Sequence, residues 1–163
     1  RVLLDERNKT ASKNLERVQK EQYGGVEATI NSEMERINAT LYSEKVNPPI
    51  LHLEGNSYDF FTQDDTGTGI AYKGLVVYDL AIASLTKLPI LVHDSLILKQ
   101  ISDEAVENIL VRYMESGKQV IISLDKQDSY SKRTAEILEK QCVLHLAPNG
   151  RELFGRAWSR QET

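Results

Sequence analysis

The feature that most constrains the fold is a proline-free, polar segment over residues 1–44, which Pro48-Pro49 brings to an end. Its apolar positions recur at steps of three, four and eight residues, which keeps them in one narrow stripe on a helix. The stripe predicts the end of a coiled-coil arm over residues 1–45 with a separate partner helix; an amphipathic helix packed on its own domain is the alternative. Gly24-Gly25 disfavours a helix by roughly 2 kcal/mol, so we expect a kink or break there. The stripe comprises Leu15, Val18, Val26, Ile30, Met34, Ile37 and Leu41.

Residues 46–163 alternate between strand-like and helix-like patterns. Two β-rich runs around Gly55-Asn56 predict a hairpin, and a polar, glycine-bearing loop over 63–69 opens onto an apolar helix that reaches about residue 85. Later segments continue the alternation, which predicts an α/β domain with a mixed sheet and flanking helices. We expect strands at 89–93, 120–124, 142–146 and about 151–155, and helices at 103–116 and near 131–140.

Charge and composition restrict the possible partners. The chain has 163 residues and a net charge of −4; residues 1–45 hold eight basic and eight acidic residues, so the remainder carries the acidic excess. A broad phosphate-binding face is therefore not expected in residues 46–163, and any DNA contact is expected through other parts of a complete protein. No apolar run approaches the ~20 residues of a membrane span, which favours a cytoplasmic protein without a membrane partner. The single cysteine, Cys142, is expected to be a small buried apolar residue.

Acidic residues follow the two most apolar strand candidates. Asp94 comes directly after the strand that ends at His93, and Asp125 follows the strand that ends at Leu124. Ligands of open α/β sheets gather beyond the carboxyl ends of strands, where a carboxylate can hold Mg²⁺ or its water shell. The alternative is that each aspartate caps the loop that follows it.

The order of these elements resembles the second half of SMC/RecN-type ABC ATPase heads. More closely, "DTGTGIAYKGLVVYDLAIASL", "LPILVHDS" and "QVIISLDK" resemble a bacterial domain-of-unknown-function family found at the C-terminus of SMC-like proteins. The resemblance covers nearly the whole chain. It implies an arm over residues 1–45 and the C-terminal lobe of an ATPase head over residues 46–163.

The resemblance also assigns roles to individual residues. It makes Asp94 the Walker B aspartate and ligand of Mg²⁺, places Ser95 where the catalytic glutamate usually stands, and puts Asp125 near the switch position that is usually histidine. A hydroxyl is a poor base at neutral pH, so slow hydrolysis or a base from elsewhere is implied. The counterpart of the signature loop, which contacts the γ-phosphate held by the opposing subunit, is Asp65, Thr66, Gly67, Thr68 and Gly69.

A Walker A loop is missing from this sequence, because no G-x-x-x-x-G-K-[ST] pattern occurs in it. The resemblance therefore implies that ATP and Mg²⁺ bind only together with the N-terminal lobe of the same head, and that the chain alone does not hydrolyse ATP. A second head would complete a homodimer, in DNA maintenance or defence.

Two other functions remain open from the sequence. A metal-dependent nuclease would use Asp94 with Asp125 and Asp128, because acids at adjacent strand ends can hold two divalent ions. A non-catalytic assembly module, with a decayed nucleotide site, would account for Ser95 and Asp125.

Overall fold

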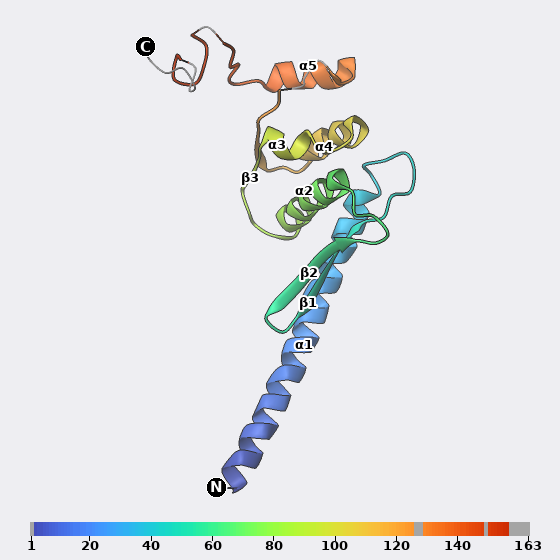
Figure 1. Cartoon of the computed structure of the whole chain (residues 1–163), viewed down its shortest axis with the longest axis vertical. Coiled ribbons are helices and arrows are strands. Elements are labelled where there is room, and N and C mark those ends of the chain that lie inside the picture. The colour runs from blue at the N-terminus through green and yellow to red at the C-terminus, as the bar shows by residue number, and fades with distance from the viewer. Residues whose placement is uncertain (1, 126–128, 149, 157–163) are drawn as a thin grey trace. The chain divides into compact units, whose positions relative to one another are not determined.

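A computed structural model describes residues 2–125, 129–148 and 150–156. The chain divides into two compact units, Arg1–Lys126 and Gln127–Thr163. In the second unit the structure describes one helix, α5 (Lys132–Gln141). In the first unit the elements are, in chain order, α1 (Val2–Asn38), β1 (Pro49–Glu54), β2 (Ser57–Thr62), α2 (Thr68–Leu85), β3 (Ile90–His93), α3 (Ser95–Leu98), α4 (Asp103–Glu115) and β4 (Gln119–Ile122) (Figure 1).

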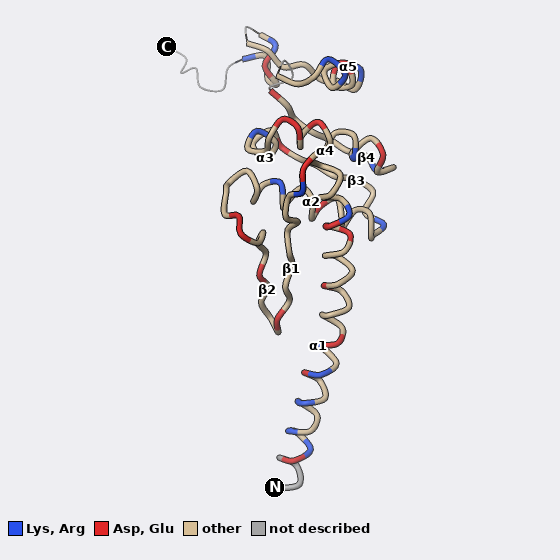
Figure 2. The backbone as a smooth tube through the Cα atoms, turned by 90° about the vertical axis from the view of Figure 1, so that its right-hand side faces the viewer, with Lys and Arg blue, Asp and Glu red and all other residues tan. Residues whose placement is uncertain are grey.

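Helix α1 is long and continuous, and its N-terminal half extends beyond the other elements of its unit (Figure 1). It runs through Gly24-Gly25, so the predicted break is wrong. Two unfavourable residues do not interrupt a helix of 37 residues, because every flanking residue adds a hydrogen bond that favours continuation. Basic and acidic residues are interspersed along its sequence (Figure 2).

The apolar stripe of α1 divides into two parts. Ile30, Met34, Ile37 and Leu41 are buried in the first unit, whereas Leu15, Val18 and Val26 are exposed. The C-terminal part of the stripe therefore packs on its own domain, as the alternative prediction of an amphipathic helix stated. The N-terminal part is an exposed apolar stripe, and its contact with a partner helix stays a prediction.

Strands β1 and β2 form the predicted antiparallel hairpin, which turns at Gly55 with a positive φ of 55°. Helix α1 covers the outer edge of β1 through side chains. The Asn31 carboxamide donates to the Leu51 carbonyl and accepts from its amide, both at 2.8 Å, and the Glu27 carboxylate accepts from the Leu53 amide at 2.9 Å. These side chains supply the hydrogen bonds that a neighbouring strand would otherwise make with the backbone of β1.

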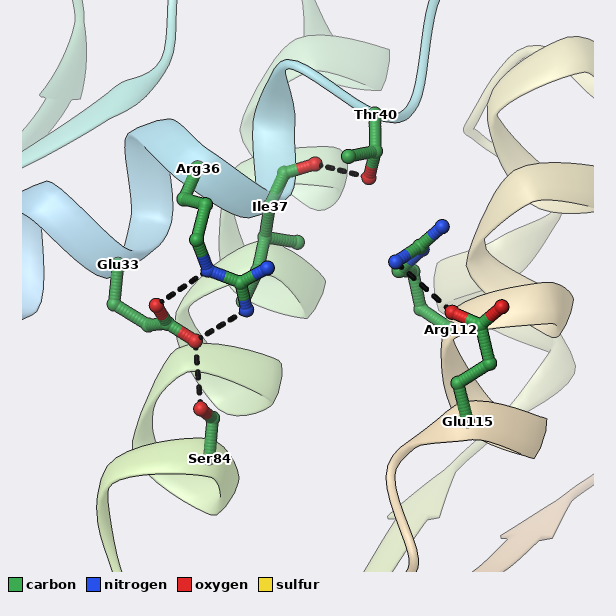
Figure 3. Close-up of polar contacts among 7 residues, drawn as sticks. All are labelled: Glu33, Arg36, Ile37, Thr40, Ser84, Arg112 and Glu115. Atoms are coloured by element: carbon green, nitrogen blue, oxygen red, sulfur yellow. Dashed lines mark hydrogen bonds and ion pairs between the residues drawn. The ribbon is translucent and has the colours of Figure 1, made fainter.

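Polar contacts also fix α1 to α2. The Glu33 carboxylate accepts two hydrogen bonds from the Arg36 guanidinium and a third from the Ser84 hydroxyl at 2.6 Å (Figure 3). The Arg36 bonds hold the pKa of Glu33 below its ordinary value, so this carboxylate is ionised at neutral pH. On α4, Arg112 pairs with Glu115 at 2.9 Å.

Helix α2 lies at the centre of the first unit and contacts α1, α3 and strands β1, β2 and β3. Among the described helices it alone is long and apolar enough to cross a membrane by length and composition. Of this helix, 39% is buried inside the structure, and its buried residues include Lys73. The cytoplasmic location stays a prediction.

The predicted single mixed sheet is wrong for the described residues. Instead there are two separate two-stranded sheets, β1–β2 antiparallel and β3–β4 parallel. The fold is therefore mixed α/β with small sheets and a long N-terminal helix. The boundary expected at residues 45/46 lies between α1 and β1, and the division into arm and head lobe stays a prediction.

The strands expected at 142–146 and 151–155 do not form in the described part of the second unit, where one isolated bridge joins Ala147 to Arg151. Val143 is 99% exposed, and Leu144 and Leu146 are exposed too. Cys142 is exposed, so its predicted burial is wrong. Apolar alternation favours a strand only where a neighbouring strand supplies hydrogen bonds, and the structure describes none beside this segment.

Candidate functional site

The carboxyl ends of β3 and β4 meet because the two strands are parallel and pair from Ile90–Gln119 to His93–Ile122. Asp94 follows β3 directly, and Ser123 follows β4. The Ser123 hydroxyl donates to Asp94 Oδ1 at 2.7 Å and accepts from the Ser95 amide at 2.9 Å. The structure thus brings Asp94, Ser95 and Ser123 together at one exposed edge.

Hydrogen bonds stabilise the ionised form of Asp94. The Ser123 hydroxyl makes the largest contribution, and the Ser95 amide the next; together they hold the pKa of Asp94 below its ordinary value. The carboxylate is therefore negative at neutral pH and exposed to solvent. Such a group can hold a hydrated divalent cation that is also bound by phosphate oxygens.

Ser95 is the first residue of the four-residue helix α3, and its hydroxyl lies 3.4 Å from Asp94 Oδ1. It is half-buried beside a carboxylate that itself remains unprotonated. Nothing in this surrounding turns the hydroxyl into a base for hydrolysis.

Asp125 has a different partner from Asp94. Its carboxylate forms an ion pair with Lys99, which follows α3, and both side chains are partly exposed. Ser123, which the sequence analysis did not single out, is the residue after β4 that contacts Asp94. From the sequence, Ser123 was expected inside a strand at 120–124, whereas β4 ends at Ile122 and leaves Ser123 directly after it.

A multi-carboxylate metal centre is not assembled in the described part of the chain, where no group of three or more His, Cys, Asp or Glu side chains could hold a metal ion. Asp128, the third acid of the nuclease hypothesis, lies outside the described residues. Among the described residues, Asp94 would contribute only one carboxylate to a metal ion, with Ser95 and Ser123 as its neighbours.

The glycine loop, residues 65–69, leads into α2. Asp65 Oδ1 accepts from the Gly67 amide at 2.9 Å, and Gly67 is the N-cap residue of α2, which has no side-chain capping hydrogen bond. Thr66 and Thr68 are exposed. The first amides of a helix lack partners within it, so this end of α2 presents donors that suit an anion.

At Gly69 the glycine loop lies against the segment that follows Asp94 in the chain. A Cβ atom at Gly69 would lie 2.5 Å from the backbone carbonyl oxygen of Gln100, closer than any side chain tolerates. Gln100 stands between α3 and α4. The absence of a side chain at residue 69 thus allows the start of α2 to lie directly against this connection.

Lys73, one turn into α2, cannot serve as a phosphate-binding lysine in this conformation. It is fully buried, and its ammonium group donates to Asn38 Oδ1 at 2.6 Å and to the Asn47 carbonyl at 3.1 Å. Burial lowers the pKa of Lys73 to about 8, while the charge of Asp65 opposes that shift. The lysine joins the end of α1 to α2.

The sequence from residue 35 to residue 158 matches a family described as uncharacterised protein conserved in bacteria (DUF2326). The chain belongs to this family. The matched region begins in the last turn of α1, continues past α5, and includes the glycine loop, Asp94, Ser95 and Asp125. No curated protein matches the chain. The predicted membership of a bacterial family of unknown function is therefore confirmed. The relation to SMC/RecN-type heads stays a prediction.

Proposed function

We propose that this DUF2326 chain is the C-terminal half of an SMC/RecN-like ATPase head, which supplies a signature loop and a Walker B aspartate for ATP-dependent head dimerisation in DNA maintenance or defence. The observation that supports it best is the position of Asp94 at the carboxyl end of an incomplete parallel sheet. The glycine loop leads into α2, and α2 contacts both β3 and α3.

The incompleteness of the β3–β4 sheet argues for a partner lobe. Parallel sheets are normally covered on both faces, and their strands are apolar on both sides for that reason. Here Leu91 and His93 face the core, but Val92 is 65% exposed, and Ile90 and Ile121 are exposed as well. An N-terminal lobe that carries the Walker A loop would cover these side chains and bring phosphates to the edge where Asp94 lies.

The residues present fit a nucleotide shared between two lobes. Asp94 would hold Mg²⁺ through an oxygen ligand, with Ser123 and Ser95 fixing the carboxylate. Bound Mg²⁺ would neutralise phosphate charge. The amides of the glycine loop, with Thr66 beside them, would face the γ-phosphate held by the second head of the homodimer.

The exposed stripe of α1 is the proposed contact of the arm. Leu15, Val18 and Val26 continue the line of Ile30 and Met34 beyond the domain, so a partner helix would cover them on the same side. DNA would be contacted through the complete protein.

The test is nucleotide binding by the complete head, in which the chain is joined or co-expressed with its Walker A lobe. We expect titration calorimetry to detect a non-hydrolysable ATP analogue with Mg²⁺, and Asp94→Asn to weaken binding about tenfold or more, since it removes a charged metal ligand. Asp59→Asn, an exposed acid on β2, is the matched control and should bind normally. A complete head that binds no Mg-nucleotide, or that is indifferent to Asp94→Asn, would rule the proposal out.

A non-catalytic assembly module is the second candidate, favoured by Ser95 at the position of the base and by the Lys99 ion pair of Asp125. Analytical ultracentrifugation of the complete head separates the two. ATP with Mg²⁺ should promote dimerisation of a working head and leave the mass of an assembly module unchanged.

A further inference from the structure

Three hydrogen-bonded side chains meet at the residue before Asp94; His93 and Tyr113 are buried, whereas the Asp79 side chain is 45% exposed. His93, the last residue of β3, is 3% exposed. Its Nε2 atom lies 2.9 Å from Asp79 Oδ2 on α2, and its Nδ1 atom lies 2.5 Å from the Tyr113 hydroxyl on α4. The rings of His93 and Tyr113 also contact each other, with centroids 5.5 Å apart. Three elements of the first unit are thus joined through one imidazole.

Both ring nitrogens of His93 have a polar partner. Burial, and next the negative charge of Asp79, raise the pKa of Tyr113 far above its ordinary value, so its hydroxyl stays protonated. The tautomer of the imidazole sets which atom donates in its contacts with Asp79 and Tyr113. Rotation of the imidazole would leave buried polar atoms without partners, which costs about 1–3 kcal/mol for each atom.

The backbone of His93 transmits this restraint to the candidate site. Its carbonyl accepts from the Ser123 amide at 3.2 Å, and the Ser123 hydroxyl in turn binds Asp94. The side chains of His93 and Asp94 belong to opposite environments, one buried and one exposed. A fixed imidazole therefore fixes the peptide from which Asp94 projects.

We propose that the Asp79–His93–Tyr113 chain is a positioning device that holds Asp94 opposite Ser123. Because Asp79 belongs to the helix that the glycine loop opens, the same contacts keep that loop and Asp94 in one rigid arrangement. The importance of this arrangement for nucleotide binding rests on the proposed function. The positioning of Asp94 is a property of the chain itself.

Amide hydrogen exchange of Ser95 and Ser123, measured by NMR on the chain without nucleotide, tests the proposal. Tyr113→Phe removes one hydrogen bond and keeps the ring, and His93→Leu removes both bonds. We expect exchange at the two serine amides to accelerate about tenfold or more in both variants, beyond any change in global stability. His93→Gln keeps an amide donor for Asp79 and should restore part of the protection.

Ile109→Val, which trims a fully buried residue of α4, is the control for simple loss of packing. It should change the two serine amides no more than amides in the core of α2. If the Tyr113→Phe and His93→Leu variants also altered exchange evenly across the unit, or left Ser95 and Ser123 unchanged, the chain would be ordinary core packing and the proposal would fail. This measurement needs no nucleotide, so its failure is distinct from the failure of nucleotide binding by the complete head.

Discussion

The burial of Lys73 leads to a quantitative prediction about stability and pH. Its hydrogen-bond acceptors, Asn38 and the Asn47 carbonyl, are uncharged. Burial lowers the pKa of Lys73 from 10.5 to about 8, and Asp65 counteracts only part of this. The protonated side chain therefore destabilises the folded state relative to the unfolded chain, where lysine ionises normally.

The sign of the pH dependence follows from the two pKa values. Below pH 8 Lys73 is protonated in both states, and the destabilisation is fully present. Between about pH 8 and 10.5 the folded protein loses the proton while the unfolded chain keeps it, so the free energy of unfolding rises with pH. The whole effect is about 3 kcal/mol, and most of it develops between pH 7 and pH 10.

Urea unfolding followed by far-UV circular dichroism, at constant ionic strength from pH 7 to pH 10, measures this effect. Lys73→Met keeps the length of the side chain and removes the ionisable group, so the difference between the unfolding free energies of wild type and variant should change by about 2–3 kcal/mol over this range. Lys87→Met, at an exposed position, is the control and should follow the wild type. Parallel stability curves for the wild type and Lys73→Met would refute the reasoning.

Gly69→Ala should destabilise the first unit by about 1–3 kcal/mol, because the new Cβ atom would collide with the Gln100 carbonyl. Gly24→Ala, in the open part of α1 with nothing within 4 Å, should instead stabilise by about 1 kcal/mol; thermal unfolding compares the two, and equal effects would contradict the close contact. Ser123→Ala removes the strongest hydrogen bond to Asp94 and should raise the pKa of Asp94 towards its ordinary value, as a carbon-detected NMR titration would show. An unchanged titration would mean that this hydrogen bond does not form in solution.

The candidate site was only partly accessible from the sequence. The position of Asp94 directly after an apolar strand could be predicted, because the run of apolar residues that ends at His93 is a local signal. The partner of Asp94 could not: Ser123 is 29 residues away, and the sequence offered Asp125 as the more conspicuous candidate. The ion pair of Asp125 with Lys99, the residue directly after α3, has no local sequence signal either.

By itself the sequence determined most local elements: the N-terminal helix, though not its continuity through Gly24-Gly25, the hairpin, the apolar helix after the glycine loop, and the strand that ends at His93. These depend on periodicity, turn residues and proline, which act over a few positions. The tertiary structure alone decided which half of the α1 stripe is buried, that Lys73 lies in the core 35 residues from its partner Asn38, and that the strands form two small sheets. The physical reason is that burial and hydrogen-bond pairing depend on which distant segments pack together, and a pattern of residue types does not specify those neighbours.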